Sequence, residues 1–323
     1  MCGWEAPRLQ ISRYTASARI PVRSPGCRIR DSGVPRGKRT GAGHPHPPRC
    51  PSPVRVRWNT VRVIIVDTPE EVARTAARRV ARAIDRARLV RAVGDRGRAA
   101  TAHGHADAPT AVLGVATGSS PLGTYRELGR LARAGEVDLS GVAAFALDEY
   151  VSLDAAHPES YHAVIRRTVT EELGLDPGLV QVPDGTAADL EAACERYERA
   201  IAEAGGVDLQ ILGIGTNGHI GFNEPDDHFS KGTHCVDLTE STIQANSRLF
   251  DSIDDVPRQA YTMGTQTIMY ARMILVVANG EAKAQAVHDM CYGPVTPACP
   301  ASILQLHTNC VVVADEAALS LCE

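Results

Sequence analysis

The segment 215–225, GTNGHIGFNEP, contains the residues of this chain that are best suited to acid–base chemistry. Its three glycines within seven positions allow the backbone to bend tightly. His219 belongs to the side-chain type that titrates near neutral pH. Glu224 is close enough in sequence to share its proton if the turn folds back, and Asn217 lies beside both. A histidine bracketed by glycines, with a carboxylate and an amide nearby, favours a catalytic role over a purely structural one.

Two further acids, Asp148 and Glu149, directly follow the apolar run 142–147. A carboxylate at the end of a buried strand is placed where α/β enzymes often carry catalytic groups. Positioned next to a carbonyl compound, it could abstract a proton. The alternative is a helix cap or a solvated corner.

A third candidate is an anion site at the run ATGSSP, which contains Gly118, Ser119 and Ser120. Backbone amides and hydroxyls at the start of a helix bind anions. Arg248 and Lys283 are surface charges or, together with this turn, a clamp for one phosphate group. The run matches neither a Walker loop nor GxGxxG, so nucleotide binding is not indicated.

The elements that must position these residues alternate between short apolar runs and helical patterns. Strands are predicted at 61–66, 111–115, 142–147, 207–214, 273–278 and 311–314, and helices at 69–92, 122–134, 158–173, 190–201 and 281–290. This alternation predicts an α/β fold with a mostly parallel sheet covered by helices on both faces, a Rossmann-like three-layer sandwich in a single domain. The candidate residues follow the strands, where such folds bind ligands.

Composition agrees with a globular enzyme. The 323 residues are 44% hydrophobic and 22% charged, with a formal net charge of −4. These values exclude a collagen, a coiled coil and a wholly disordered chain. No apolar run reaches the roughly 18 residues that span a bilayer, so we expect no membrane association.

Residues 1–60 differ from the rest. They hold 12 Arg and Lys against 2 acids, and 9 of the 20 prolines. We expect a disordered basic leader before a catalytic domain at 61–323, because this segment cannot bury enough apolar surface to offset its ordering entropy. Three interpretations exist: a transit peptide, a nucleic-acid tail, or sequence upstream of a natural start near Val61. The last is favoured, since proline opposes a transit helix and no nucleic-acid module is visible.

The nine cysteines show no paired spacing, which indicates reduced thiols and a cytoplasmic protein. The pairs His44/His46 and His103/His105 lack a third ligand nearby, so no metal site is expected.

The chain resembles the glucosamine-6-phosphate deaminase (glucosamine/galactosamine-6-phosphate isomerase) family across about residues 61–323. The matching motifs are 116–121 (ATGSSP), 147–151 (LDEYV), 157–161 (HPESY), 212–225 (LGIGTNGHIGFNEP), 245–250 (ANSRLF), 262–264 (TMG) and 300–307 (PASILQLH). They occur in the order of the family, and GHIGFNEP combined with LDEY is highly specific.

The resemblance implies cofactor-free isomerisation and deamination of glucosamine 6-phosphate to fructose 6-phosphate and ammonium, in the catabolism of amino sugars such as N-acetylglucosamine. It makes Asp148 the base that moves a proton between C2 and C1. His219 assists ring opening, and Glu224 and Asn217 support it. The remaining assignments are phosphate-binding residues: Gly118, Ser119, Ser120, Arg248 and Lys283. The implied partner is a small phosphosugar, with no nucleic acid, and whether the chain forms a homo-oligomer stays open.

The sequence departs from the family at several positions. Asn217 stands where some members have Asp, and Gln266 and Tyr270 replace small and acidic residues. His234 and Val236 stand where allosteric members carry an Arg and a Lys for an effector phosphate. The loop 94–109 is longer than usual.

Two alternatives remain. A 6-phosphogluconolactonase-like hydrolase would share the phosphate turn but would lack the Asn223-Glu224-Pro225 run and the acids of LDEYV. A sugar-phosphate sensor without turnover would need a DNA-binding module, for which residues 1–60 have no helical pattern.

Overall fold

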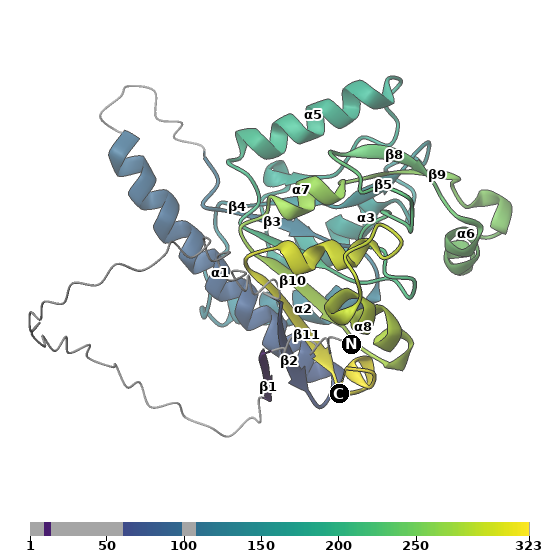
Figure 1. Cartoon of the computed structure of the whole chain (residues 1–323). Coiled ribbons are helices and arrows are strands. Elements are labelled where there is room, and N and C mark those ends of the chain that lie inside the picture. The colour runs from purple at the N-terminus through teal and green to yellow at the C-terminus, as the bar shows by residue number, and fades with distance from the viewer. Residues whose placement is uncertain (1–9, 14–60, 99–107, 323) are drawn as a thin grey trace, which may run out of the picture. The chain divides into compact units, whose positions relative to one another are not determined.

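One large parallel sheet organises the protein, in a computed structural model that describes residues 10–13, 61–98 and 108–322 (Figure 1). All pairings within this sheet are parallel. Its strand order is β1 (Gln10–Arg13), β2 (Arg62–Val66), β11 (Cys310–Asp315), β10 (Ile274–Ala278), β7 (Leu209–Leu212), β3 (Ala111–Val115), β4 (Val142–Ala146) and β6 (Val180–Gln181).

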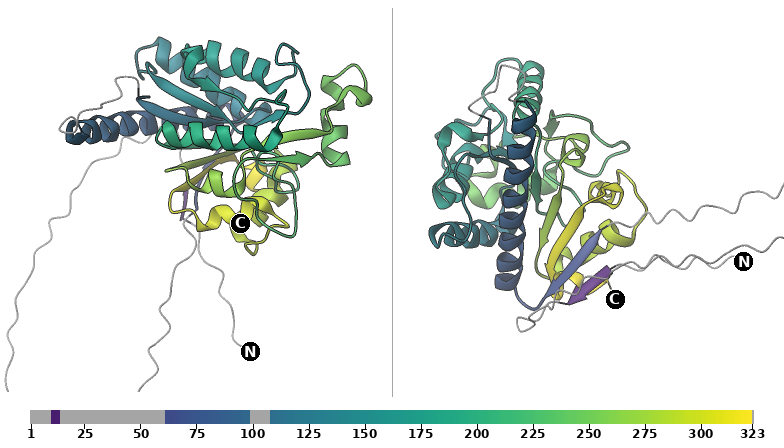
Figure 2. Two further views of the ribbon diagram at one scale, coloured as in Figure 1. Left: turned by 90° about the horizontal axis from the view of Figure 1, so that it is seen from above. Right: turned by 90° about the vertical axis from the view of Figure 1, so that its left-hand side faces the viewer.

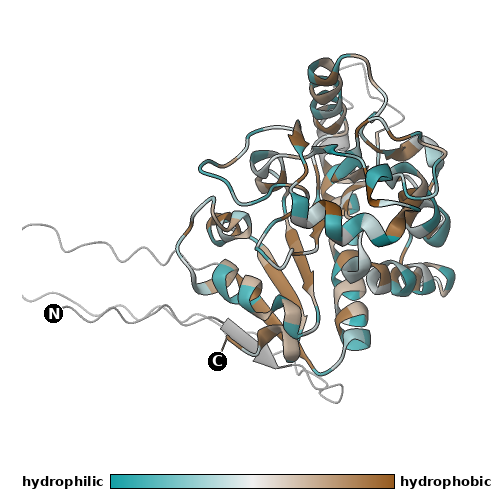
Figure 3. Cartoon of the chain, turned by 90° about the vertical axis from the view of Figure 1, so that its right-hand side faces the viewer, coloured by the Kyte–Doolittle hydropathy of each residue, from teal (hydrophilic) through white to brown (hydrophobic). Residues whose placement is uncertain are grey.

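The central strands are buried on both faces, which explains why they appear in the sequence as continuous apolar runs. Every residue of β3, β4, β7, β10 and β11 is buried. A strand that alternated polar and apolar residues would place polar groups against one of the two helical layers. In Figure 3 these strands form an apolar centre behind helices of mixed polarity.

Helices cover both faces of the sheet (Figure 2). The first face carries α1 (Pro69–Arg98), α2 (Ser119–Arg133) and a continuous helix made of α3 (Tyr161–Ile165), the π-helical η1 (Arg166–Thr170) and α4 (Glu171–Leu173). The second face carries α5 (Leu190–Glu203), α7 (Thr265–Met269), α8 (Ala284–Tyr292) and the 3-10 helix η6 (Pro300–Leu306). The predicted three-layer α/β sandwich is therefore confirmed for the described residues.

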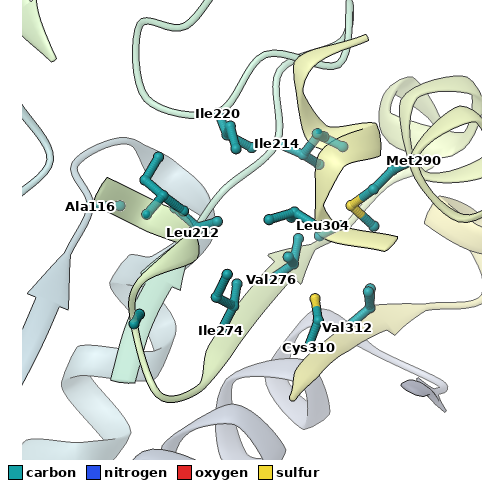
Figure 4. Close-up of a cluster of buried hydrophobic side chains, with 14 of the residues drawn as sticks. Ala116, Leu212, Ile214, Ile220, Ile274, Val276, Met290, Leu304, Cys310 and Val312 are labelled. Carbon is teal, nitrogen blue, oxygen red and sulfur yellow. The ribbon is translucent and has the colours of Figure 1, made fainter. Parts of the chain in front are cut away.

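Each face of the large sheet has its own hydrophobic core, and successive residues of a strand point alternately into one core and the other. In β10, Val276 packs into the core beneath α8 and η6, whereas Leu275 and Val277 pack into the core beneath α1 and α2. Figure 4 shows Val276 beside Met290 of α8 and Leu304 of η6. Since these side chains are completely buried, both layers hold the strand ends in fixed positions.

A second, smaller sheet was not predicted. It consists of the antiparallel strands β5 (Asp148–Tyr150), β9 (Gln259–Thr262) and β8 (His234–Asp237). After β8 the chain continues through α6 (Glu240–Asn246) and the 3-10 helices η3 (Ser247–Leu249) and η4 (Ile253–Asp255) before it returns in β9. Three further 3-10 helices are η2 (Pro177–Leu179), η5 (Glu281–Lys283) and η7 (Ala317–Leu319).

Within the predicted leader, Gln10–Arg13 pair with β2 as a parallel edge strand, and a disordered leader stays a prediction. Such pairing uses backbone N–H and C=O groups, so it needs little side-chain pattern. Except for β1, residues 1–60 lie outside the described residues, as do both His-x-His pairs.

The predicted loop 94–109 begins too early. Helix α1 continues to Arg98 through Gly94 and Gly97, each of which costs a helix only about 1 kcal/mol. The predicted helix at 158–173 begins instead at Tyr161, after Ser160 whose side chain caps the N–H of Ala163.

No described helix combines the length and the apolar character needed to cross a membrane. The six described cysteines form no disulfide with one another.

Candidate active site

The candidate residues meet at a cavity of about 390 Å³ beyond the carboxyl ends of β3, β4, β7 and β10. The cavity therefore lies at the edge of the large sheet where α/β folds bind their ligands, beyond the carboxyl ends of the parallel strands. All but one of the site residues predicted from the sequence line this cavity: Gly118, Ser119, Ser120, Asp148, Asn217, His219, Arg248 and Lys283. The exception, Glu224, contacts two of these residues from behind.

One end of the cavity is the start of α2. Gly118 precedes the helix with φ of 87°, a left-handed backbone value that favours glycine. No side chain caps this helix, and its first turn contains no acid. The first amides of α2, next to the hydroxyls of Ser119 and Ser120, are therefore oriented to receive an anion.

Two cations face the same cavity from other elements. Lys283 lies in η5, after β10, and burial lowers the pKa of its ammonium group. The N–H of Gly280, which precedes η5, donates to both carboxylate oxygens of the buried Asp315 at 3.0 and 3.1 Å. Arg248, in η3, is exposed and makes no ion pair with any described residue. A dianionic group would complete this arrangement of donors and cations.

Asp148 is the most strongly perturbed acid of the cavity. Its side chain is 5% exposed, and its Oδ1 has no hydrogen-bond partner among the described residues. Burial, and to a smaller extent the neighbouring carboxylate of Glu149, raise its pKa to about 8. A carboxylate in this state is a strong base, because protonation relieves its desolvation.

Glu149 has a different task. Its carboxylate accepts hydrogen bonds from the N–H groups of Tyr150, Tyr161 and His162 at 2.7, 2.9 and 2.7 Å. It thereby joins β5 to the first turn of α3. The alternative interpretation of this acid pair as a helix cap is therefore correct for Glu149, while Asp148 faces the cavity.

His219, Glu224 and Asn217 form the predicted group. The amide Nδ2 of Asn217 donates to Oε2 of Glu224 at 2.6 Å, and Nδ1 of His219 lies 3.3 Å from Oε1 of Glu224. That approach does not have hydrogen-bond geometry, so the ring must turn slightly to share a proton with Glu224. A Cβ at Gly215 would lie 2.4 Å from the imidazole, so only glycine lets the ring lie against this turn.

A fourth member, Thr242 of α6, was missed in the sequence. Its hydroxyl donates to Oε1 of Glu224 at 2.6 Å. Burial alone would raise the pKa of Glu224, but the adjacent imidazole of His219, followed by the hydrogen bonds from Thr242 and Asn217, lowers it to about 2. Because Asn217 acts as a donor, its amide stabilises the ionised Glu224 in a way that an ionised Asp could not.

The site thus combines two carboxylates whose pKa values are displaced in opposite directions, Asp148 in the cavity wall and Glu224 behind it. Asp148 is poised to take and return a proton, and Glu224 stays ionised to hold the imidazole of His219. The other unusual residues identified in the sequence lie elsewhere: Gln266 and Tyr270 hydrogen-bond to each other on α7 and do not line the cavity.

Similarity to known proteins agrees with this geometry. The family described as glucosamine-6-phosphate isomerases/6-phosphogluconolactonase matches residues 67–313. A glucosamine-6-phosphate deaminase of Halothermothrix orenii is 50% identical over 213 residues, 66% of this chain and 88% of that protein. The one from Cutibacterium acnes is 48% identical over 260 residues, 80% of this chain and 92% of that protein.

Solved structures of known proteins share the fold of this chain. A monomeric glucosamine-6-phosphate deaminase superposes with a TM-score of 0.71 and 40% identity, covering 80% of this chain and 99% of that chain. A 6-phosphogluconolactonase from Trypanosoma brucei superposes with a TM-score of 0.60 but only 19% identity, covering 82% and 100%. The second likeness concerns the fold alone.

Proposed function

The chain belongs to the family of glucosamine-6-phosphate isomerases and 6-phosphogluconolactonases, and we propose that within it the chain is a glucosamine-6-phosphate deaminase. The reaction converts glucosamine 6-phosphate and water to fructose 6-phosphate and ammonium, a step of amino-sugar catabolism. The observation that carries this choice is that one cavity brings together the buried Asp148, whose Oδ1 has no hydrogen-bond partner among the described residues, and His219 with its neighbour Glu224. The same cavity holds the donors and cations that suit a phosphate, which we call the phosphate grip: the start of α2 with Ser119 and Ser120, Arg248 and Lys283.

The phosphate of the substrate occupies the end formed by α2. Its oxygens accept from the first amides of α2 and from Ser119 and Ser120, while Arg248 and Lys283 balance its charge. Because the phosphate is held at one end, C1 and C2 at the other end of the sugar lie near Asp148 and His219. The proton transfers that follow then occur within one complex.

Ring opening comes first. The reaction removes the proton from the O1 hydroxyl and delivers one to the ring oxygen, so the C1–O5 bond breaks and a C1 aldehyde forms. His219 suits this transfer because an imidazole has one nitrogen that can accept a proton and another that can donate one. Oε1 of Glu224 lies 3.3 Å from its Nδ1, and Asn217 and Thr242 donate hydrogen bonds to Glu224.

Proton transfer between C2 and C1 follows. Asp148 removes the C2 proton and the C–H electrons form a C1–C2 double bond, while the C1–O1 π electrons move to O1, which takes up a proton that the C2 ammonium releases. The lone pair of the C2 nitrogen then forms a C2–N double bond as the same carboxyl returns the first proton to C1. The resulting C2 iminium takes up water and releases ammonia. Oxidation at C2 is matched by reduction at C1, so the sequence as written needs no cofactor. The cationic C2 ammonium of the substrate lowers the pKa of Asp148 on binding, so that the base is ionised when it is needed.

Two observations favour the deaminase over the lactonase. The matched deaminases are 40 to 54% identical, whereas the matched lactonase structures are 16 to 19% identical. Lactone hydrolysis also has no use for a base placed to shuttle a proton between two carbons. A cytoplasmic location is proposed in addition, supported by the lack of paired cysteine spacing in the sequence.

The test is ammonium release from glucosamine 6-phosphate by the full chain, coupled to detection of fructose 6-phosphate. Asp148→Asn should bind the substrate but lose turnover, because an amide cannot accept the C2 proton. Exchange of the C2 hydrogen with solvent deuterium should be lost in parallel. Absence of ammonium release, with hydrolysis of 6-phosphogluconolactone instead, would reassign the chain, and binding without any turnover would make it a sensor.

A further inference from the structure

Asp315 is a buried carboxylate that the proposed reaction does not use. It is the last residue of β11, the strand beside β10 (Figure 1), and it is only 4% exposed. Both of its carboxylate oxygens accept from the N–H of Gly280, and Oδ1 also accepts from the N–H of Ala318 at 2.9 Å. Asp315 therefore joins the turn after β10 to η7, the 3-10 helix that follows β11.

We propose that Asp315 is a positioning residue for substrate binding, which holds the turn that carries Lys283 of the phosphate grip. It acts through the backbone, from the N–H of Gly280 to η5. It does not line the cavity, and it makes no ion pair with the ammonium group of Lys283. The inference rests on the proposed function and adds a residue on which its phosphate grip depends.

The first argument is the backbone conformation of Gly280. Its φ of 84° and ψ of 151° lie in a region that is essentially restricted to glycine. A Cβ at this position would meet no atom within 4 Å, so the conformation, and not a lack of space, calls for glycine. Such a conformation persists only where the surroundings hold it. The carboxylate of Asp315 supplies that hold, since it binds the N–H of Gly280 with both oxygens.

The second argument is the short path from this turn to Lys283. Gly280 immediately precedes η5, and Lys283 is the last residue of η5. The N–H of Lys283 donates to the carbonyl of Gly280 at 3.1 Å. The other two residues of η5, Glu281 and Ala282, are exposed, so burial of their side chains does not hold the turn. A rotation of the backbone at Gly280 would therefore move Lys283 relative to the sheet.

The third argument is that no acid fixes the ammonium group of Lys283. This half-buried residue makes no ion pair within the part of the chain that the structure describes, and burial is what lowers its pKa. Its place in the cavity then depends on where the backbone of η5 puts it. The other cation of the grip, Arg248, lies on η3 and does not depend on this turn.

A purely structural role for Asp315 predicts different behaviour. Helix α8, which follows Lys283, is anchored by the buried Ala284, Val287 and Met290. If this packing alone fixed Lys283, loss of the carboxylate would lower stability and leave phosphate binding unchanged in the folded protein. If Asp315 positions Lys283, the loss weakens phosphate binding, and the effect requires Lys283.

The experiment measures binding of inorganic phosphate by calorimetry, and KM and kcat for glucosamine 6-phosphate, with the full chain. Asp315→Asn keeps the shape of the side chain but replaces one acceptor by an NH₂ group, which would face a backbone N–H. We expect inorganic phosphate to bind roughly 3- to 10-fold more weakly, the range for one hydrogen bond. KM should rise by a similar factor, and kcat should change less.

Double variants identify the group through which Asp315 acts. In the Lys283→Ala background, Asp315→Asn should change phosphate binding by less than about twofold, because the side chain that it positions is gone. In the Arg248→Ala background it should keep its full effect, because Arg248 is carried by another element.

Asp208→Asn is the matched control. Asp208 is also a buried carboxylate that accepts a backbone N–H, from Val112 at 2.9 Å, but it lies just before β7 and does not line the cavity. We expect this variant to be less stable and to bind phosphate as the wild type does. If Asp315→Asn does not fold, Gly280→Ala disturbs the same turn with the carboxylate in place and replaces it in the comparison.

Three results would overturn the positioning role of Asp315. They are an unchanged phosphate affinity in Asp315→Asn, an equal loss of affinity with and without Lys283, and a wild-type chain that does not bind phosphate at all. A wild-type chain that binds phosphate but releases no ammonium would instead refute the proposed function, and the phosphate measurements would still decide the role of Asp315.

Discussion

Asp148 should make the protein less stable as the pH rises, and Asp148→Asn should remove that loss. The carboxyl is buried and its Oδ1 lacks a hydrogen-bond partner among the described residues. Its charged form is therefore poorly solvated in the folded chain but well solvated in the unfolded chain. Asparagine has nearly the same shape and carries no charge at any pH.

The size of the effect follows from the pKa of Asp148. Burial and the neighbouring Glu149 raise it from 3.8 to about 8. Below pH 3.8 the carboxyl is neutral in both states, and its contribution to stability is fully present. As the pH rises toward 8, the unfolded chain releases the proton and the folded chain keeps it, so stability falls by about 1.4 kcal/mol per pH unit. Above pH 8 the difference levels off, on the order of 5 kcal/mol.

The assay is urea unfolding of the wild type and of Asp148→Asn between pH 4 and pH 9. The free energies of unfolding should be close at pH 4 and should separate in favour of the variant as the pH rises. Asp251→Asn, the same change at an exposed position, should track the wild type throughout. A difference between Asp148→Asn and the wild type that does not depend on pH would refute the argument that Asp148 is a desolvated base.

Further predictions concern the phosphate grip, the sheet and the leader. Arg248→Ala and Lys283→Ala should each lower kcat/KM for glucosamine 6-phosphate, with a loss of transition-state stabilisation of about 1.5–3 kcal/mol. Steady-state kinetics should show little change in the turnover of unphosphorylated glucosamine. Asp208→Ala should lower the free energy of unfolding by about 3 kcal/mol, because the buried carboxylate pairs with Arg91 and Arg272 at 2.9 and 3.1 Å; an unchanged urea midpoint would contradict this. A chain that starts at Val61 lacks β1 but should keep the kcat of the full chain, since β1 pairs only with β2 at the edge of the sheet; a large loss of turnover would mean that the leader supports the site.

The strand-end placement of the site could be predicted because it depends on local patterns. Strands buried on both faces appear as continuous apolar runs, and the residues directly after them face the ligand edge. This reasoning brought Ser119 and His219 to one cavity from runs that end about 100 residues apart.

Other features depend on contacts that no local pattern encodes. The sequence predicts one strand at 142–147 followed by two acids outside any strand. In the structure β4 ends at Ala146, and the two acids begin β5, a strand of the small sheet that pairs with β9 more than 100 residues later. Thr242 lies in a short polar helix and is identified only by its contact with Glu224. The extension of α1 through Gly94 and Gly97 reflects the modest cost of each glycine in a helix, about 1 kcal/mol.

The presence of two sheets divides the chemistry between two frameworks. The ring-opening group His219 and the serines of the phosphate turn follow strands of the large sheet, whereas Asp148 belongs to the small one. The two frameworks meet where the N–H of Met263 donates to the carbonyl of Leu147 at 2.7 Å, one residue before Asp148. Because Asp148 and the phosphate turn belong to different sheets, their separation depends on how the small sheet packs against the large one.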